Sequence, residues 1–362
     1  MKHLELHIIQ SVPVSCLNRD DFGSPKTAIF GGVTRSRISS QCWKRAARSE
    51  MKLLAPQFFK GERTRLFIMP LAEKIRELTG NEESAREAAK LIGEEIAKLD
   101  KPKKGDTEAA IKVKTLYFTS PAELDDIARL YAKHEEAEGK SVKNSVASVI
   151  KELKKKKGLC EDAADIAIFG RMVASQPDLT IEGASMFNHA LSTNRVSNEI
   201  DFFTAVDDLQ SEAESGAGMT GTLEFNSATY YRFAALNLDM LFDQTHLGAL
   251  PEDDRKAVIK AFVQAVVMSL PKARKNSMNA NTVPSYVLAV IRDQGHPVQL
   301  VNAFEKPVEA AHASVVENSI TRLKKEYQNL KEDWDIHAVK ELSCPDEIKF
   351  KDLLEEVAAN AI

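Results

Sequence analysis

The sequence of 362 residues predicts an α+β fold, a ferredoxin-like βαββαβ core that carries two large insertions. Three observations lead to this prediction. Segments at 3–12 and 222–233 alternate apolar and polar residues, which is typical of strands. Stretches of helical periodicity separate such segments, and residues 70–157 are rich in Ala, Glu and Lys throughout. The composition is 43% hydrophobic, enough for the core of one large or two ordinary domains.

The first predicted elements are a strand, a loop and a helix. The strand over 3–12 places Leu, Leu and Ile on one face and two His and a Glu on the other, so we expect it to be half-buried. Residues 14–37 contain three glycines and one proline among polar residues, which predicts a long, functional loop: Gly23, Pro25, Gly31 and Gly32. Ser39 and Ser40 can cap a helix that ends near Leu54. The helical period turns four of its side chains inward: Trp43, Ala46, Ala47 and Leu53.

The later elements follow in the same way. After the helical segment, residues 166–175 predict a short strand or helix end, and residues 190–222 form an acidic, Gly-containing excursion. We then expect the strand over 222–233, a helix over 252–270 and a buried strand over 285–293. Helices starting near residues 314 and 347 complete the chain.

Composition excludes several classes of protein. The net charge is −4, so the chain is not basic overall. No run of about 18 apolar residues predicts a membrane span, and the first ten residues do not form the apolar stretch of a signal peptide. We therefore expect a cytoplasmic protein without a membrane partner. Four well-separated cysteines indicate reduced thiols, and neither a metal site nor a nucleotide-cofactor motif is predicted.

Basic residues are concentrated between positions 26 and 52. Against one acid, Glu50, this segment holds seven basic residues: Lys26, Arg35, Arg37, Lys44, Arg45, Arg48 and Lys52. Phosphate suits the start of a helix, where free N–H groups and hydroxyls meet the positive end of the dipole. One small anion needs two or three charges, so seven favour a nucleic-acid strand over an ordinary solvated helix face. Residues 271–284 form a second basic, polar loop.

Other interpretations of the sequence remain open. Asp20 and Asp21, with Asp207 or Asp208, are candidates for a Mg²⁺-dependent ribonuclease, although turn-forming aspartates are commoner. A general single-strand binder is a third hypothesis. From spacing alone, the Met and Phe residues at 172 and 203 are expected to be core residues.

The segment SCLNRDDFGSPKTAIFGGVTRSRISSQCWKRAAR (15–48) resembles the CasC family, the backbone subunits of the type I-E CRISPR surveillance complex, Cascade. Four further blocks agree in order: IAIFGRMVAS (166–175), DFFTAVDDLQ (201–210), TLEFNSATYYRF (222–233) and NAFEKPV (302–308). Such a match implies a hand-shaped subunit. Its palm, a modified RNA-recognition-motif fold, would take residues 1–65, 161–190 and 225–362, its helical fingers residues 66–160, and its β-hairpin thumb residues 191–224.

The resemblance also implies function. Copies of such a subunit stack along one CRISPR RNA, beside other Cascade subunits, and present the guide for pairing with target DNA. The family is non-catalytic in type I-E, so Asp20 and Asp21 would serve structure, and no cofactor is implied. The fingers and the thumb tip show no detailed match.

Site residues are implied position by position. Palm residues that hold guide phosphates would be Lys26, Ser39, Ser40, Gln41, Lys44, Arg45 and Arg48. Met172 and Phe203 would pack against bases at the kinks of the guide. The predicted RNA-binding set is completed by other basic residues: Arg19, Arg171, Lys272, Arg274 and Lys275.

Overall fold

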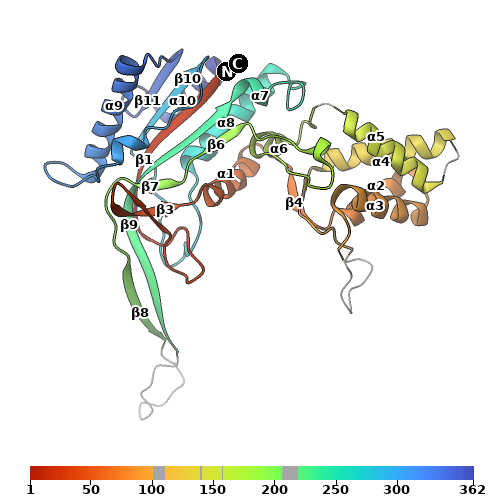
Figure 1. Cartoon of the computed structure of the whole chain (residues 1–362), viewed down its shortest axis with the longest axis horizontal. Helices are drawn as coiled ribbons and strands as arrows, with labels where there is room; N and C mark the ends of the chain where they lie inside the picture. Colours follow the sequence, from red (N-terminus) through yellow and green to blue (C-terminus); the bar gives the residue numbers. More distant parts are fainter. Residues whose placement is uncertain (101–110, 139–140, 157, 206–218) are drawn as a thin grey trace, which may run out of the picture. The chain divides into compact units, whose positions relative to one another are not determined.

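The computed structural model describes residues 1–100, 111–138, 141–156, 158–205 and 219–362, and its fold is α+β, as predicted (Figure 1). The described chain divides into two compact units. Unit 1 comprises Met1–Glu50, Met186–Ala235 and Ile259–Ile362. Unit 2 comprises Met51–Ser185 and Leu236–Val258.

Unit 1 is built on an antiparallel sheet. In the described part of the chain it has nine strands, in the order β11-β10-β1-β9-β7-β3-β2, and β6 and β8 also pair with β9. The strand bounds are β1 His3–Ser15, β2 Thr27–Phe30, β3 Val33–Ile38, β6 Ser185–Phe187, β7 Ala190–Ser192, β8 Glu199–Ala205, β9 Met219–Asn237, β10 Tyr286–Arg292 and β11 Lys340–Cys344. The strands expected over 222–233 and 285–293 are confirmed as parts of β9 and β10. The ferredoxin-like assignment of this core stays a prediction.

Helices cover the sheet of unit 1. Alternate residues of β1 and β9 bury Val12 and Tyr230 with Trp43 of α1 in one apolar cluster. The opposite face buries Ile9 and Phe233 against α9 and a short 3₁₀ turn, Val301–Phe304. The helix bounds are α1 Ser40–Leu54, α8 Glu252–Met268, α9 Val315–Trp334 and α10 Phe350–Ala361, so the predicted helices are confirmed.

The expectation that β1 is half-buried is wrong. His3, Glu5 and His7 are buried as completely as the leucines beside them. The Glu5 carboxylate accepts hydrogen bonds from both imidazoles, at 3.0 and 3.3 Å, and from Arg292, at 3.0 Å. Burial acts to raise the pKa of Glu5, but the bonds from the two histidines, the charge of His7 and the backbone N–H of Val298 outweigh it and lower the pKa to about 2. A polar face can therefore be buried because its charges are paired inside the fold.

The predicted loop over 14–37 is largely a hairpin. β1 continues to Ser15, and β2 pairs with β3 across a two-residue turn at Gly31 and Gly32, whose φ angles are +60° and +76°. Two positive φ angles are typical of the type I′ turn, which favours glycine. A Cβ on Gly31 would also lie 1.7 Å from the Glu305 carbonyl oxygen. The Gly-Gly pair thus serves the hairpin, and only residues 16–26 form an irregular loop.

A two-stranded ribbon occupies part of the predicted thumb. β8 pairs with the first residues of β9, from Glu199 opposite Phe225 to Ala205 opposite Met219. Every residue of β8 is exposed. The intervening residues 206–218, which include Asp207 and Asp208, lie outside the described residues.

Unit 2 is mainly helical over the segment where periodicity predicts helices. Its core lies among α2 to α5, and Gly93 of α3 lets the Ile68 side chain approach, because an added Cβ would lie 2.9 Å from it. The bounds are α2 Ile68–Thr79, α3 Glu82–Ala97, α4 Pro121–Glu138, α5 Val142–Lys155, α6 Ala164–Phe169, α7 Leu238–Leu241, β4 Glu62–Thr64 and β5 Tyr117–Thr119. None of the described helices is both long and apolar enough to cross a membrane. The four cysteines are free thiols.

Candidate nucleic-acid interface

The first turns of α1 present a basic face. Trp43, Ala47 and Met51 are buried at i, i+4 spacing, which leaves Arg45 and Gln41 exposed and Lys44 and Arg48 half-buried on the other sides. Leu53, expected to face inward, is 72% exposed instead. Met51 takes the inward position because it lies two i+4 steps from Trp43.

Arg232 of β9 holds α1 against the sheet. Its guanidinium lies 3.2 Å from the centre of the Trp43 ring and donates to Gln10 Oε1 at 2.6 Å and to the Val267 carbonyl at 3.1 Å. Burial lowers the pKa of Arg232 well below its usual value. A cation stacked on Trp43 and bonded to the last turn of α8 holds α1 in place on the sheet.

The start of α1 is already partly satisfied within the protein. Ser39 is buried, and its hydroxyl accepts from Cys42 N at 3.3 Å, so it acts as the N-cap. Ser40 N–H donates to His189 Nδ1 at 3.3 Å, and an Arg37 nitrogen lies 3.4 Å from the same atom. Because both neighbours are donors, His189 Nδ1 accepts and Nε2 carries the hydrogen. Burial, with Arg37 and Lys26, lowers the pKa of His189, so the ring is neutral.

Cations from loop 16–26 and from α1 lie around Cys42. Burial raises the pKa of the Cys42 thiol, and the charges of Arg45 and Lys26 act against this rise. Lys26 is held by backbone bonds from its N–H to Asn18 O and from Arg37 N–H to its own carbonyl, both at 2.8 Å. Residues 19 apart in sequence therefore place their positive charges around one point of unit 1.

Two of the seven basic residues have internal roles. Arg35 is 0% exposed and donates to four backbone carbonyls, at Ser192, Thr193, Phe304 and Glu305. Lys52 donates to the Gly61 carbonyl at 2.6 Å. Arg35 thus braces the fold and cannot meet a phosphate, so counting it among the phosphate-binding charges is wrong.

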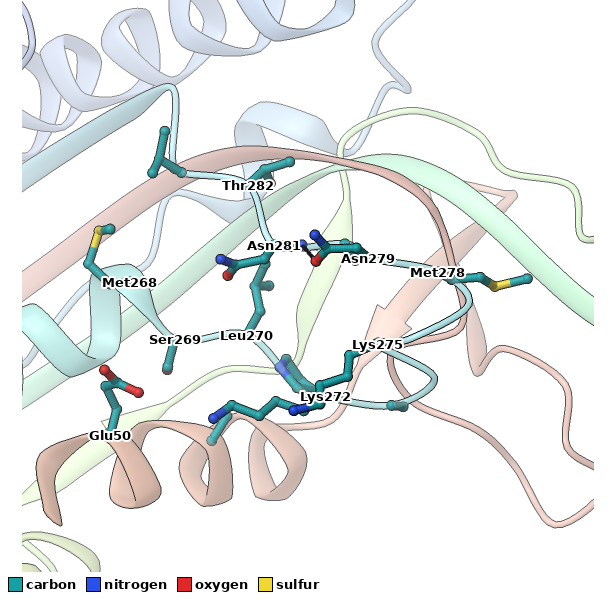
Figure 2. A pocket seen from close by; sticks show the side chains of 15 residues that line it. Glu50, Met268, Ser269, Leu270, Lys272, Lys275, Met278, Asn279, Asn281 and Thr282 are labelled. Carbon is teal, nitrogen blue, oxygen red and sulfur yellow. Dashed lines mark hydrogen bonds between the residues drawn. The ribbon is translucent and has the colours of Figure 1, made fainter. Parts of the chain in front are cut away.

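The second basic loop meets α1 around a cavity. A space of about 430 Å³ is lined by Ala46 and Glu50 of α1 and by the chain from Met268 to Val283, including Lys272 and Lys275 (Figure 2). The two predicted RNA-binding elements of unit 1 therefore form one continuous surface.

Arg19 and Arg274 extend this surface. Burial raises the pKa of the Cys16 thiol, the charges of Arg19 and Arg274 oppose the rise, and those of Asp20 and Glu224 add to it, so both cations and two acids lie near that thiol. Arg19 is exposed, and its backbone bridges that of Pro25. Loop 16–26 and loop 271–284 thus contribute cations to the same part of unit 1.

Asp20 has a structural role in its loop. Its Oδ1 accepts from Phe22 N at 2.9 Å and from Ser24 N at 3.0 Å, as in a turn capped by aspartate. Among the residues that the structure describes, no group of three or more His, Cys, Asp or Glu side chains is placed to hold a metal ion. The paired-carboxylate hypothesis stays a prediction, because Asp207 and Asp208 lie outside the described residues.

Phe203 lies on the ribbon, 40% exposed, directly opposite Gly221. A Cβ on Gly221 would lie 2.6 Å from Phe203 Cζ, so the ring rests over the glycine. Met219, opposite Ala205, is exposed on the same face of the ribbon, and the exposed Phe202 lies on the other face. An apolar surface this exposed suits contact with another molecule.

Arg171 and Met172 lie in unit 2 and differ sharply in environment. Arg171 is buried and donates to both carboxylate oxygens of Glu123, at 2.7 and 2.9 Å, and to the Phe118 carbonyl. Met172 beside it is 83% exposed. The backbone of Arg171 is paired in both directions with that of Ile181, so Met172 is presented to solvent from a fixed position. The predicted RNA contact of Arg171 stays a prediction, and its geometry favours a supporting role.

The sequence did not indicate two residues of this surface. His189 precedes a short strand and has no neighbouring motif, and Glu50 is the single acid of the basic segment. Only the fold shows that His189 contacts the start of α1 and that Glu50 lines the cavity.

Known proteins share this architecture. Residues 4–360 match the family described as CT1975-like protein. A solved chain from a "CRISPR RNA-guided surveillance complex, pre-nicking" is 28% identical with a TM-score of 0.82, and the match covers 99% of this chain and 100% of that one. Another, from a "CRISPR RNA-guided surveillance complex", is 24% identical with a TM-score of 0.70 over 99% of both chains. No curated protein sequence matches this chain. The chain therefore belongs to the CT1975-like protein family.

Proposed function

We propose that this chain is a CRISPR RNA-binding subunit of a type I-E surveillance complex, the CasC backbone subunit. In this role, several copies assemble along one guide RNA in the cytoplasm, beside other subunits, and present the guide for pairing with target DNA. The subunit is a scaffold and catalyses no reaction.

One observation carries the proposal: cations from separate elements converge on the exposed side of α1. The charges of Lys26 and Arg45 both act to lower the pKa of the Cys42 thiol. Those of Arg19 and Arg274 act in the same way on the Cys16 thiol. Convergent cations along an exposed helix suit successive phosphates of one strand. The likeness to a chain of a CRISPR RNA-guided surveillance complex, 28% identical over 99% of this chain, supports RNA of the CRISPR type as that strand.

The exposed apolar side chains give the scaffold a second task. Met172 follows Arg171, whose backbone pairs with that of Ile181, and Phe203 lies in β8 opposite Gly221. Apolar side chains presented in this way can wedge between bases and interrupt their stack. Arg171, bonded to Glu123, then serves by holding Met172 in position.

Recognition of this kind depends on backbone charge and shape. Phosphate contacts carry no sequence information, and base pairing between guide and target supplies it. We therefore expect binding that weakens steeply with salt and tolerates any guide sequence over most positions.

The first test is to express the chain with its neighbouring genes and a CRISPR array, purify it by a tag and sequence the bound RNA. One discrete species of spacer plus repeat, in a large complex, is the expected result. RNA-free protein, or random RNA fragments, would overturn the proposal.

A charge variant tests the placement of the site. Lys44→Ala with Arg45→Ala and Arg48→Ala should abolish co-purification of guide RNA. The matched control changes Lys325, Lys349 and Lys351 to Ala, three exposed lysines on α9 and at α10 that alter net charge equally. Equal loss of RNA from both variants would refute a specific site on α1.

A further inference from the structure

The cavity beside α1 is lined by none of the three basic residues Lys44, Arg45 and Arg48 of that helix. Its volume of about 430 Å³ falls within the range of about 300–1,000 Å³ that is usual for small-ligand sites. It is lined entirely by residues of unit 1, from the second half of α1 and from the chain between α8 and β10. A site for one nucleotide-sized group therefore adjoins the basic surface.

The walls combine apolar and polar groups. Met268, Leu270, Pro271 and Val283 supply apolar surface. Figure 2 shows the Glu50 carboxylate rising from α1 toward the loop, with Asn279 and Asn281 across from the helix. A planar heterocycle with polar edges suits this mixture, because its faces are apolar and its rim forms hydrogen bonds.

The loop is held in one conformation before any ligand binds. Arg274 has a φ of +52°, unusual for a residue with a side chain, and its carbonyl accepts from Met278 N at 2.8 Å. Thr282 ties the loop to β1 through a bond from its hydroxyl to Ser11 O and a bond from Gln10 to its carbonyl, both at 2.7 Å. Such strain, kept in place by several bonds, is typical of preformed binding sites.

Two polar groups in the walls, the Glu50 carboxylate and the Ser269 hydroxyl, have no hydrogen-bond partner among the described residues. Glu50 is half-exposed, and within the part of the chain that the structure describes no hydrogen bond or ion pair engages its carboxylate, although it lies in the most basic segment. The Ser269 hydroxyl is buried and also lacks a hydrogen-bond partner. A carboxylate beside Lys272 and Lys275 disfavours a bare anion such as phosphate but accepts from an N–H donor. The occupant should therefore be anionic at one end and carry an amino group at the other.

We propose that this cavity binds one nucleobase of the RNA strand held on α1, and that Glu50 accepts a hydrogen bond from the exocyclic amino group of that base. The inference rests on the proposed function, because the strand must already lie on α1. Lys272 and Lys275 meet the phosphate of the same nucleotide. Adenine, cytosine and guanine carry such an amino group. Uracil offers only its ring N3–H, which is flanked by two carbonyl oxygens that a carboxylate repels, so the cavity disfavours uracil at this position.

The test measures binding of the full chain to fluorescein-labelled RNA 12-mers of A, C or U by fluorescence anisotropy. Homopolymers make every binding register equivalent. We expect the U oligomer to bind about fivefold or more weakly than the A and C oligomers.

Two variants separate the cavity from general differences between the oligomers. Glu50→Met removes both the charge and the acceptor, and should bring the ratio of U to A dissociation constants close to one. Glu309→Met makes the same change at an exposed position outside the cavity and should leave the ratio unchanged. Asn281→Ala, on the opposite wall, should weaken all three oligomers together, because an amide can donate and accept.

The outcomes distinguish this inference from the proposed function. A ratio that Glu50→Met leaves at the parental value, or unchanged affinity in Asn281→Ala, would overturn the nucleobase site while salt-dependent binding remained. Failure of every oligomer to bind would overturn the proposed function itself.

Discussion

Replacing Arg35 and Arg45 separately by Met should have opposite consequences, although both arginines belong to one basic segment. Arg35→Met is expected to destabilise unit 1 and to leave the salt dependence of RNA binding unchanged. Arg45→Met is expected to leave stability unchanged and to reduce that salt dependence.

The magnitudes follow from the contacts. The Arg35 guanidinium donates to four carbonyls at distances of 2.8 to 3.0 Å. The Thr193 carbonyl also accepts from Val308 N at 2.9 Å, so loss of Arg35 deprives the other three, at Ser192, Phe304 and Glu305, of this donor. A buried carbonyl without a donor costs about 1–3 kcal/mol, and water can reach the Glu305 side, so we expect a total loss of about 4 kcal/mol. Each phosphate contact contributes about 0.7 to the slope of log K against log salt for a single strand, so Arg45→Met should lower that slope by about 0.7.

Tryptophan fluorescence during urea unfolding provides the stability assay. The two tryptophans of the chain, Trp43 and Trp334, both lie in unit 1, so the signal follows that unit. RNA binding is measured by anisotropy between about 50 and 200 mM salt. A salt slope lowered by Arg35→Met in folded protein, or a parental slope in Arg45→Met, would refute this division of roles.

Three further predictions concern other parts of the molecule. Gly221→Ala should displace the Phe203 ring and reproduce the effect of Phe203→Ala on nuclease protection of bound RNA, and distinct protection patterns would contradict this. The lowered pKa of Glu5 contributes about 3 kcal/mol of stability near neutral pH, which is lost as pH falls from about 5 toward 2. Urea titrations by tryptophan fluorescence should show this loss, and Glu5→Gln should lack it. The assembled complex should not cut complementary RNA with Mg²⁺, and regularly spaced cuts that Asp20→Ala abolishes would instead establish a ribonuclease.

Strands and helices with a clear period could be predicted from the sequence. β10 is a short apolar run and α8 has helical spacing, and both were found where expected. β1 misled the prediction because two histidines and a glutamate on one face resemble a solvated edge. Both histidines pair with Glu5, and Glu5 pairs with Arg292, 287 residues further along the chain. Local periodicity does not reveal this pairing.

The candidate site was predictable in its helix and less so in its surroundings. The basic side of α1 follows from spacing, since Trp43 and Ala47 define the buried side. Arg35 could not be distinguished from its basic neighbours, because strand alternation alone does not reveal the carbonyls that surround it. One wall of the cavity is the loop at 271–284. Lys272 lies 222 residues after Glu50 in the sequence, so only the fold could bring the two together.

β9 gives the ribbon a mechanical property. The same strand pairs with β8 in the ribbon and runs on between β1 and β7 in the sheet. A pull on the ribbon along its length is carried by one continuous backbone into the middle of the sheet, without a hinge. The pairing of β9 with β1 on one side and with the short strand β7 on the other resists that load together, so tension from a bound strand is transmitted to the sheet of unit 1.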